Sequence, residues 1–259
     1  MKRVIARLDV KGENVIKGVH LEGLKIIDTA KNLSFKYAKQ DIDEIYFHDS
    51  VASLYERNNL TNIIEEVSAN INIPLTVGGG IKKVEDIEKI LISGADKVSI
   101  NTKFIEDVKS VSKFTKKFGS QAIVGSIEAK FLNNDWYCFT DNGRNLTNNK
   151  VKDWIINLQN EGVGELIITS VDMEGTKKGF DYNLLEAIQK SIKIPLIVSG
   201  GIGKYDDIKK CFNNEIVTGV AIASIVHNDS TNFNKIKKNC NLEKRNIPIF
   251  NIKKNKQKV

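Results

Sequence analysis

Residues 73–81 read IPLTVGGGI, and residues 194–202 repeat this stretch almost unchanged as IPLIVSGGI. Each copy joins a proline, a short apolar run and a pair of glycines, which is the pattern of a buried strand that ends in a tight turn. The segments that follow also agree, because DIEKI at 86–90 matches DIKKC at 207–211. The two halves of the chain therefore carry the same structural unit.

Further strand-like runs alternate with segments whose apolar residues have helical spacing. Two matched halves could form a doubly wound sheet, but eight strands favour a closed ring that leaves no strand edge unpaired. We predict a (β/α)8 TIM barrel with a twofold half-barrel repeat, as a single domain over residues 1–240, with a hairpin at 136–140 after the fifth strand. The predicted strands are 3–9, 44–49, 74–79, 97–101, 122–128, 165–170, 195–200 and 219–224.

The composition is that of a globular chain. The 259 residues are 41% hydrophobic and 27% charged, which excludes disorder throughout. No apolar run approaches the roughly 20 residues of a membrane-spanning helix, so no membrane partner is expected. Cys138, Cys211 and Cys240 lack CxxC spacing, so the sequence predicts neither a disulfide framework nor a zinc site. We expect a protein of the reducing cytoplasm that needs no metal or organic cofactor.

The net charge of +7 is concentrated at one end of the chain. From Lys235 to Val259 there are nine basic residues and one acidic residue, so the rest of the chain is almost neutral. A nearly neutral body argues against a nucleic-acid-binding groove. We expect residues 241–259 to form a basic, solvated and frayed C-terminal tail.

Two carboxylates end matching strands, Asp9 in the first and Glu128 in the fifth. In a (β/α)8 barrel the chemistry takes place at the carboxyl ends of the strands, and the first and fifth strands lie opposite each other. The pair could act as general acid and general base on two sides of one ligand. The alternative is that each carboxylate caps a helix or pairs with a lysine such as Lys11 or Lys130.

Glycines form a second signal at the same end of the barrel. Gly78, Gly79 and Gly80 follow the third strand, and Gly200 and Gly201 follow the seventh. Glycine permits close approach of the backbone to a ligand, and free N–H groups after such a turn can bind phosphate. The fourth and eighth strands add donors in Asn101-Thr102 and Ala223-Ser224. The sequence predicts two anion sites on opposite rims, suited to a molecule with a phosphate at each end.

The opposite ends of the strands carry four charges of alternating sign, namely Arg3, Glu44, Lys97 and Glu165. Their spacing favours a salt-bridged plug, since barrel interiors are filled. A polar gate for a small molecule is the alternative.

The histidines give no comparable signal. His20 and His227 fall in predicted loops or helix starts. His48 is expected to point toward the helix layer and to be packed there, without a part in catalysis.

The strand-end residues described above lie in segments that resemble those of the cyclase subunit of imidazole glycerol phosphate synthase, from histidine biosynthesis. The resemblance extends from about residue 2 to residue 240 and leaves the lysine-rich end outside. The segments that carry it are RLDV (7–10), VIKGV (15–19), DEIYFHD (43–49), IPLTVGGGI (73–81), GADKVSINT (94–102), FGSQAIV (118–124), GELIITSVDMEGTKKGFD (164–181), IPLIVSGGIG (194–203) and AIASIVH (221–227).

The resemblance implies that a glutaminase subunit docks on the N-terminal face of the barrel and that ammonia passes through the barrel to the opposite mouth. There it would meet a bis-phosphorylated ribulosyl-formimino aminoimidazole carboxamide nucleotide. The products would be imidazole glycerol phosphate and aminoimidazole carboxamide ribotide.

The resemblance also implies roles for individual residues. Asp9 and Glu128 correspond to the catalytic carboxylates. The four alternating charges correspond to an ammonia gate in the family. The resemblance therefore favours a gate over the salt-bridged plug that the spacing alone favoured. The implied substrate-binding residues are Lys17 in a mobile first loop, Gly80, Asn101 and Thr102 at one phosphate site, Gly201, Ala223 and Ser224 at the other, and Thr169 and Gly175.

Three positions depart from the pattern of the family. Glu128 and Glu174 stand where the family has aspartates, and Arg7 stands where it usually has a small residue. Such changes are similar to those of a divergent branch found with surface-polysaccharide genes, whose members are thought to supply ammonia for acetamidino sugars. Three alternatives to an active cyclase therefore stay open. They are an ammonia-conducting paralogue with altered or lost cyclase activity, a catalytically idle phosphate-binding scaffold, and an isomerase built from the same half-barrels.

Overall fold

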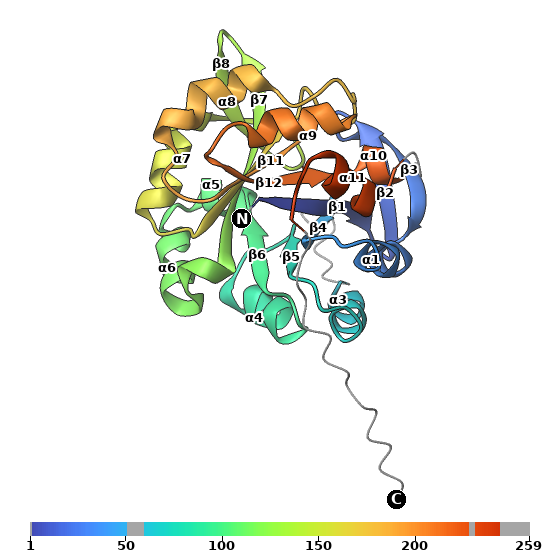
Figure 1. Cartoon of the computed structure of the whole chain (residues 1–259). Coiled ribbons are helices and arrows are strands. Elements are labelled where there is room, and N and C mark those ends of the chain that lie inside the picture. The colour runs from blue at the N-terminus through green and yellow to red at the C-terminus, as the bar shows by residue number, and fades with distance from the viewer. Residues whose placement is uncertain (1, 51–59, 228–230, 244–259) are drawn as a thin grey trace, which may run out of the picture.

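The strands of this chain close into a ring (Figure 1). The computed structural model describes residues 2–50, 60–227 and 231–243. Within these ranges eight parallel strands pair in order, and the pairing of β7 with β10 and of β12 with β1 completes the circle. In ring order they are β1 (Arg3–Lys11), β4 (Glu44–Asp49), β5 (Leu75–Gly78), β6 (Lys97–Ile100), β7 (Ile123–Leu132), β10 (Glu165–Ser170), β11 (Leu196–Ser199) and β12 (Val217–Ile222).

The predicted (β/α)8 barrel is therefore confirmed, and the doubly wound alternative is wrong. Of the predicted tail at 241–259, residues 244–259 lie outside the described residues.

Helices cover the outside of the ring (Figure 1). They are α1 (Ala30–Ala38), α3 (Thr61–Ser68), α4 (Val84–Ile92), α5 (Thr102–Glu106), α6 (Lys109–Phe118), α7 (Val151–Asn160), α8 (Tyr182–Ile188), α9 (Tyr205–Phe212), α10 (Ser224–His227) and α11 (Phe233–Asn239), with 3-10 turns at Ser120–Ala122 and Gln189–Ser191. No helix within the described ranges is long and apolar enough to cross a membrane.

The repeat seen in the sequence extends to the helix caps. The carboxylate of Asp86 accepts from the backbone N–H of Lys83 at 3.0 Å, and Asp207 accepts from Lys204 at 3.0 Å in the second half. Each aspartate lies in the first turn of its helix, α4 or α9, where a negative charge also favours the helix dipole. These matched caps orient the helix after each glycine turn in the same way.

Two antiparallel hairpins extend the barrel beyond its rim. The hairpin β8 (Asp135–Thr140) and β9 (Asn145–Lys150) follows β7, and its first strand was predicted from residues 136–140. The hairpin β2 (Asn14–Val19) and β3 (Glu22–Thr29) follows β1. The sequence was expected to form only a loop there, and it lacks the Asn-Gly or Asp-Gly turn that would signal a hairpin. Both hairpins grow from the strands that carry the candidate carboxylates.

Side chains along β1 alternate between the helix layer and the barrel interior. Val4, Ala6 and Leu8 belong to the large core between strands and helices, whereas Ile5 belongs to a small separate cluster inside the ring. Its other members come from five different strands, namely Tyr46, Val124, Ile167, Ile197 and Ala221. This apolar layer fills the barrel, and the alternation directs Arg3, Arg7 and Asp9 to the inside as well.

Candidate active site

Asp9 and Glu128 lie on opposite sides of the ring, as the sequence predicted. Along the pairing order β1-β4-β5-β6-β7 the two strands are separated by three others, and β10, β11 and β12 separate them on the other side. Both side chains are buried, each residue being 4% exposed. The pair is thus held by the barrel and is largely removed from water.

Positive charges surround Asp9. Its Oδ1 accepts from Arg7 Nε at 2.8 Å, and its Oδ2 lies 3.3 Å from Lys17 Nζ. Burial acts to raise the pKa of Asp9, but the two cations outweigh it and hold that pKa well below the usual range. The lysine partner is therefore Lys17 of the first hairpin, and not Lys11. Asp9 is ionised at neutral pH and can accept a proton.

The surroundings of Glu128 have the opposite effect. Its Oε2 accepts one hydrogen bond, from the backbone N–H of Gly143 at 2.8 Å. Burial raises the pKa of Glu128 to about 7, although the Gly143 N–H and the charge of Arg7 act against this rise. Near neutral pH this carboxyl can hold a proton and donate it. At neutral pH Asp9 is therefore ionised and Glu128 can be protonated, which are the states that a base and an acid need, although its two cationic neighbours make Asp9 a weak base.

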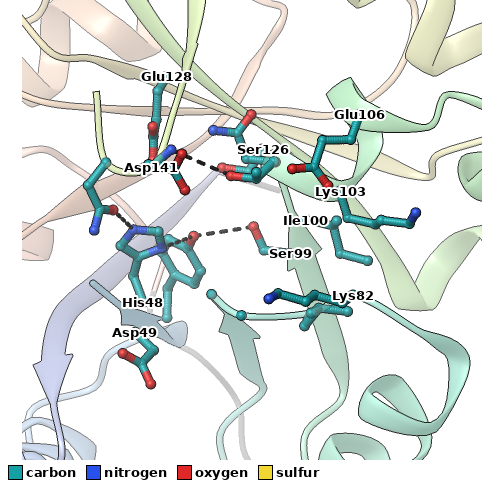
Figure 2. Close-up of a pocket in the computed structure, with 17 residues that line it drawn as sticks. His48, Asp49, Lys82, Ser99, Ile100, Lys103, Glu106, Ser126, Glu128 and Asp141 are labelled. Atoms are coloured by element: carbon teal, nitrogen blue, oxygen red, sulfur yellow. Dashed lines mark hydrogen bonds between the residues drawn. The ribbon is translucent and has the colours of Figure 1, made fainter. Parts of the chain in front are cut away.

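Glu128 lines a cavity at the carboxyl ends of β4 to β7 (Figure 2). The volume of this cavity is about 270 Å³. Gly79 and Gly80 line it with φ angles of +100° and +68°, a backbone region that favours glycine. Asn101 and Thr102 line it from the end of β6, and the buried Asn101 Oδ1 has no hydrogen-bond partner in the part of the chain that the structure describes. The first predicted anion site and the acid Glu128 therefore share one cavity, whose charged lining also includes Lys82, Lys103 and the acidic residues Asp49, Glu106 and Asp141.

The predicted orientation of His48 toward the helix layer is wrong, because this side chain lines the same cavity (Figure 2). Tyr46 belongs to the interior cluster, so the residue two positions later faces the interior too. His48 Nδ1 lies 3.1 Å from Tyr46 Oη, and Nε2 lies 2.7 Å from Asn142 Oδ1. Burial and the charge of Arg7 lower the pKa of His48. The inward orientation of His48 was predictable from the alternation along the strand, because the apolar Ile45 and Phe47 face the helices.

A second, smaller pocket lies across the mouth, at the ends of β11 and β12. Its lining includes the predicted residues Gly175, Gly201, Ala223 and Ser224. Gly201 has a φ angle of +84°, and a Cβ atom there would lie 2.0 Å from the carbonyl oxygen of Gly179, so only glycine fits. The two predicted anion sites are thus separate pockets. Thr169 lines neither of them, and its buried Oγ1 accepts from Arg7 Nη1 at 2.8 Å.

The first hairpin is docked onto the loop after β10. The Lys17 ammonium forms an ion pair with Glu174 in addition to its contact with Asp9. The backbone N–H of His20 donates to the carbonyl oxygen of Glu174 at 2.8 Å. Burial lowers the pKa of Lys17, but the two carboxylates outweigh it and raise this pKa overall. The hairpin therefore brings a permanent positive charge to the edge of the mouth.

The four alternating charges meet at the opposite end of the barrel. Arg3 Nη1 lies 2.6 Å from Glu44 Oε2, and Arg3 also pairs with Glu165. Lys97 Nζ completes the ring, 3.2 Å from Glu44 Oε2 and 2.8 Å from Glu165 Oε2. Each charge thus touches two of opposite sign, which gives a closed cycle beneath the apolar interior layer.

Comparisons with known proteins agree with this geometry. A family model described as "Histidine biosynthesis protein" matches residues 3–232. The chain is 48% identical over 206 residues to the imidazole glycerol phosphate synthase subunit HisF of Legionella pneumophila, which covers 79% of this chain and 97% of that relative. It is 38% identical over 238 residues to the HisF subunit of Dictyoglomus thermophilum, covering 92% of this chain and 94% of the relative.

The matched region contains the whole strand ring, both pockets and the cycle of four charges. The resemblance inferred from the sequence motifs is thereby confirmed. The chain belongs to the histidine biosynthesis protein family and groups there with the HisF subunits of imidazole glycerol phosphate synthase.

Proposed function

We propose that this chain is the cyclase subunit of an imidazole glycerol phosphate synthase. It would use ammonia to convert the bis-phosphorylated ribulosyl-formimino aminoimidazole carboxamide nucleotide to imidazole glycerol phosphate and aminoimidazole carboxamide ribotide. The observation that carries the proposal is the opposed pair Asp9 and Glu128, with pKa values displaced in opposite directions. The printed names of relatives that cover most of the chain support the same conclusion.

The proposed chemistry needs both protonation states. When ammonia adds to a carbonyl carbon, one proton must be removed from nitrogen and a second delivered to oxygen, and this exchange is repeated when the oxygen leaves as water. Asp9, kept ionised by Arg7 and Lys17, is suited to accept the first proton. Glu128, whose pKa is raised to about 7, is suited to deliver the second. The opposed strands let the two groups act on opposite sides of the substrate.

The substrate would span the mouth with one phosphate in each glycine-lined pocket. Gly80, Asn101 and Thr102 would hold one phosphate, beside Glu128. Gly201, Ala223 and Ser224 would hold the other, with Gly175 from the neighbouring loop. Near the middle of the mouth, Lys17 contacts both Asp9 and Glu174, and Thr169 accepts a hydrogen bond from Arg7. This arrangement would place the middle of the substrate between the carboxylates.

Ammonia would come from a glutaminase subunit docked on the N-terminal face of the barrel. The cycle formed by Arg3, Glu44, Lys97 and Glu165 lies at that end and would act as its gate. Neutral ammonia is small and carries no charge that the cycle would repel, whereas glutamine and glutamate are zwitterionic or anionic. Such a gate would admit ammonia and exclude both glutamine and glutamate.

The test is an assay of the purified chain without a partner, with an ammonium salt and the bis-phosphate nucleotide. We expect formation of imidazole glycerol phosphate, because both carboxylates and both pockets belong to this chain. The absence of this product, at a pH where free ammonia is present and with the barrel folded, would contradict the proposal. It would favour the ammonia-conducting paralogue or the idle scaffold.

A further inference from the structure

Arg7 is the one position in β1 where a large cation enters the barrel interior above the apolar layer. The residue is 2% exposed, and its guanidinium reaches across the ring. Nε donates to Asp9 Oδ1 at 2.8 Å on its own strand. Nη1 donates to Thr169 Oγ1 at 2.8 Å and to Ser199 Oγ at 3.1 Å, on β10 and β11. The face of the Tyr46 ring lies 5.9 Å away. Three strands are therefore tied together by one side chain.

This network leaves part of the guanidinium unused. Among the described residues, no hydrogen-bond partner is found for Nη2, which carries two N–H groups. Arg7 also lines the second pocket, together with Gly200, Gly201 and Ser224. A buried guanidinium with free donors at the base of a glycine-lined pocket is well suited to an anionic oxygen, because its planar fork matches phosphate geometry.

The charges around Arg7 also favour an added anion. Asp9 and Glu174 face the guanidinium as negative charges, but Lys17 pairs with both of them. Arg7 and Lys17 together balance the two carboxylates, so the buried cluster carries no net charge before a ligand arrives. Lys177 lines the same pocket from the loop after β10 and adds a positive charge. Lys177 thus supplies the positive charge that the neutral cluster lacks, and Arg7 supplies the unused N–H donors.

We propose that Arg7 is a further ligand-binding residue, whose Nη2 holds an oxygen of a phosphate monoester in the Gly201 pocket. Through Nε the same side chain fixes Asp9, so that the end of the ligand and the proposed base are positioned by one group. The inference rests on the proposed function only in taking this pocket as a phosphate site. The alternative is that Arg7 is purely structural and stabilises the barrel without touching ligand.

The test follows inorganic phosphate binding by NMR at the backbone amides of Gly201 and Gly80, which report the two pockets separately. In Arg7→Met the charge and donors are lost but the chain length is nearly kept. We expect the phosphate affinity at Gly201 to fall about 10- to 100-fold, the range for one charge-assisted hydrogen bond, while the affinity at Gly80 stays unchanged. Arg7→Lys keeps the charge without the fork, and we expect a loss of at least about fivefold at Gly201.

The matched control is Lys237→Met. Lys237 is also 2% exposed, and it pairs with Asp43 at the opposite end of the barrel at 2.6 Å. This variant should lower the melting temperature, as loss of any buried cation would, and leave the phosphate affinity of both pockets unchanged.

Unchanged phosphate affinity at Gly201 in either folded Arg7 variant would overturn the role of Arg7 and leave the phosphate site intact. Failure of the wild-type chain to respond at either glycine would overturn the phosphate pockets of the proposed function, and the role of Arg7 with them.

Discussion

The carboxylate of Glu128 accepts a hydrogen bond from the backbone N–H of Gly143, at 2.8 Å. Gly143 lies in the turn between β8 and β9, so the hairpin after β7 folds back onto Glu128 in the strand from which it grew. Its φ angle is +73°, and a Cβ atom there would lie 2.9 Å from Val171 Cγ1. The inserted hairpin thus positions the proposed acid. The glutamate side chain is long enough for its carboxylate to reach the N–H of Gly143.

Glu128→Asp should therefore impair the chain. The shorter side chain withdraws the carboxyl from Gly143 and from the substrate, and a misplacement of about 1 Å can reduce the rate roughly a hundredfold. Ammonia-dependent turnover of the bis-phosphate substrate measures the effect. A gain of turnover would mean instead that glutamate at this position had reduced the cyclase activity of the native chain.

Asp9→Asn should abolish most of the turnover. Loss of a general base reduces the rate by about a hundredfold to ten-thousandfold. It also removes the hydrogen-bonded ion pair with Arg7, and breaking a buried ion pair destabilises a protein by about 3–5 kcal/mol. Turnover and chemical denaturation of the same sample separate the two effects. A folded variant with unchanged product formation would support the idle scaffold, in which Asp9 has no catalytic part.

The raised pKa of Glu128 predicts a pH-dependent stability. Its pKa in the unfolded chain is near 4.5, and in the folded chain it is about 7. A group with a raised folded pKa contributes stability that is complete below pH 4.5 and is lost as the pH rises through 7. The free energy of unfolding should lose about 3 kcal/mol from this group between those limits. Denaturant titrations of the wild type and Glu128→Gln check this, because the variant should lack that contribution; identical pH profiles would contradict it.

Gly201→Ala should remove the second pocket. The added Cβ would lie 2.0 Å from the carbonyl oxygen of Gly179, and the φ angle of +84° is unfavourable for alanine. Gly12→Ala is the control, since Gly12 has a φ of +60° but no atom within 4 Å of an added Cβ. Gly12→Ala should cost about 1–2 kcal/mol of stability and leave the turnover intact. Gly201→Ala should cost more and lose affinity for the substrate; equal effects would show that close packing is unimportant there.

Arg3→Met distinguishes a gate from a plug. Without Arg3, Lys97 is the one cation left among the described residues that bridges the carboxylates of Glu44 and Glu165, so the cycle of charges is open. In the complex with a glutaminase, the glutamine-dependent turnover should fall several-fold relative to the turnover with added ammonium. If the four charges form a plug, the variant should instead have reduced stability and an unchanged ratio of the glutamine-dependent rate to the ammonium-dependent rate.

Most of the fold was predictable from the sequence, because a parallel ring leaves a strong local pattern. The strand runs, the repeat of IPLTVGGGI and the opposed positions of Asp9 and Glu128 follow from periodicity alone. The hairpin β2–β3 was missed, since its turn at His20 and Leu21 uses φ angles of +50° and +64° in residues that do not signal this geometry.

The site was less predictable than the fold, because it depends on contacts between distant segments. That Lys17 joins Asp9 to Glu174 requires two loops to meet, which no spacing reveals. The opposite pKa displacements also depend on three-dimensional surroundings, namely two cations beside one carboxylate and burial around the other. His48 was misassigned for a simpler reason, because the inward phase of its strand was taken one residue out of register.

The most direct test of the opposed acid and base is a ¹³C NMR titration of the carboxyl carbons of Asp9 and Glu128 in the folded wild-type chain. We predict that Glu128 titrates near pH 7 and that Asp9 remains ionised below the ordinary range of an aspartate. Titration of both groups together, each at its ordinary value, would contradict the division of roles on which the proposed function depends.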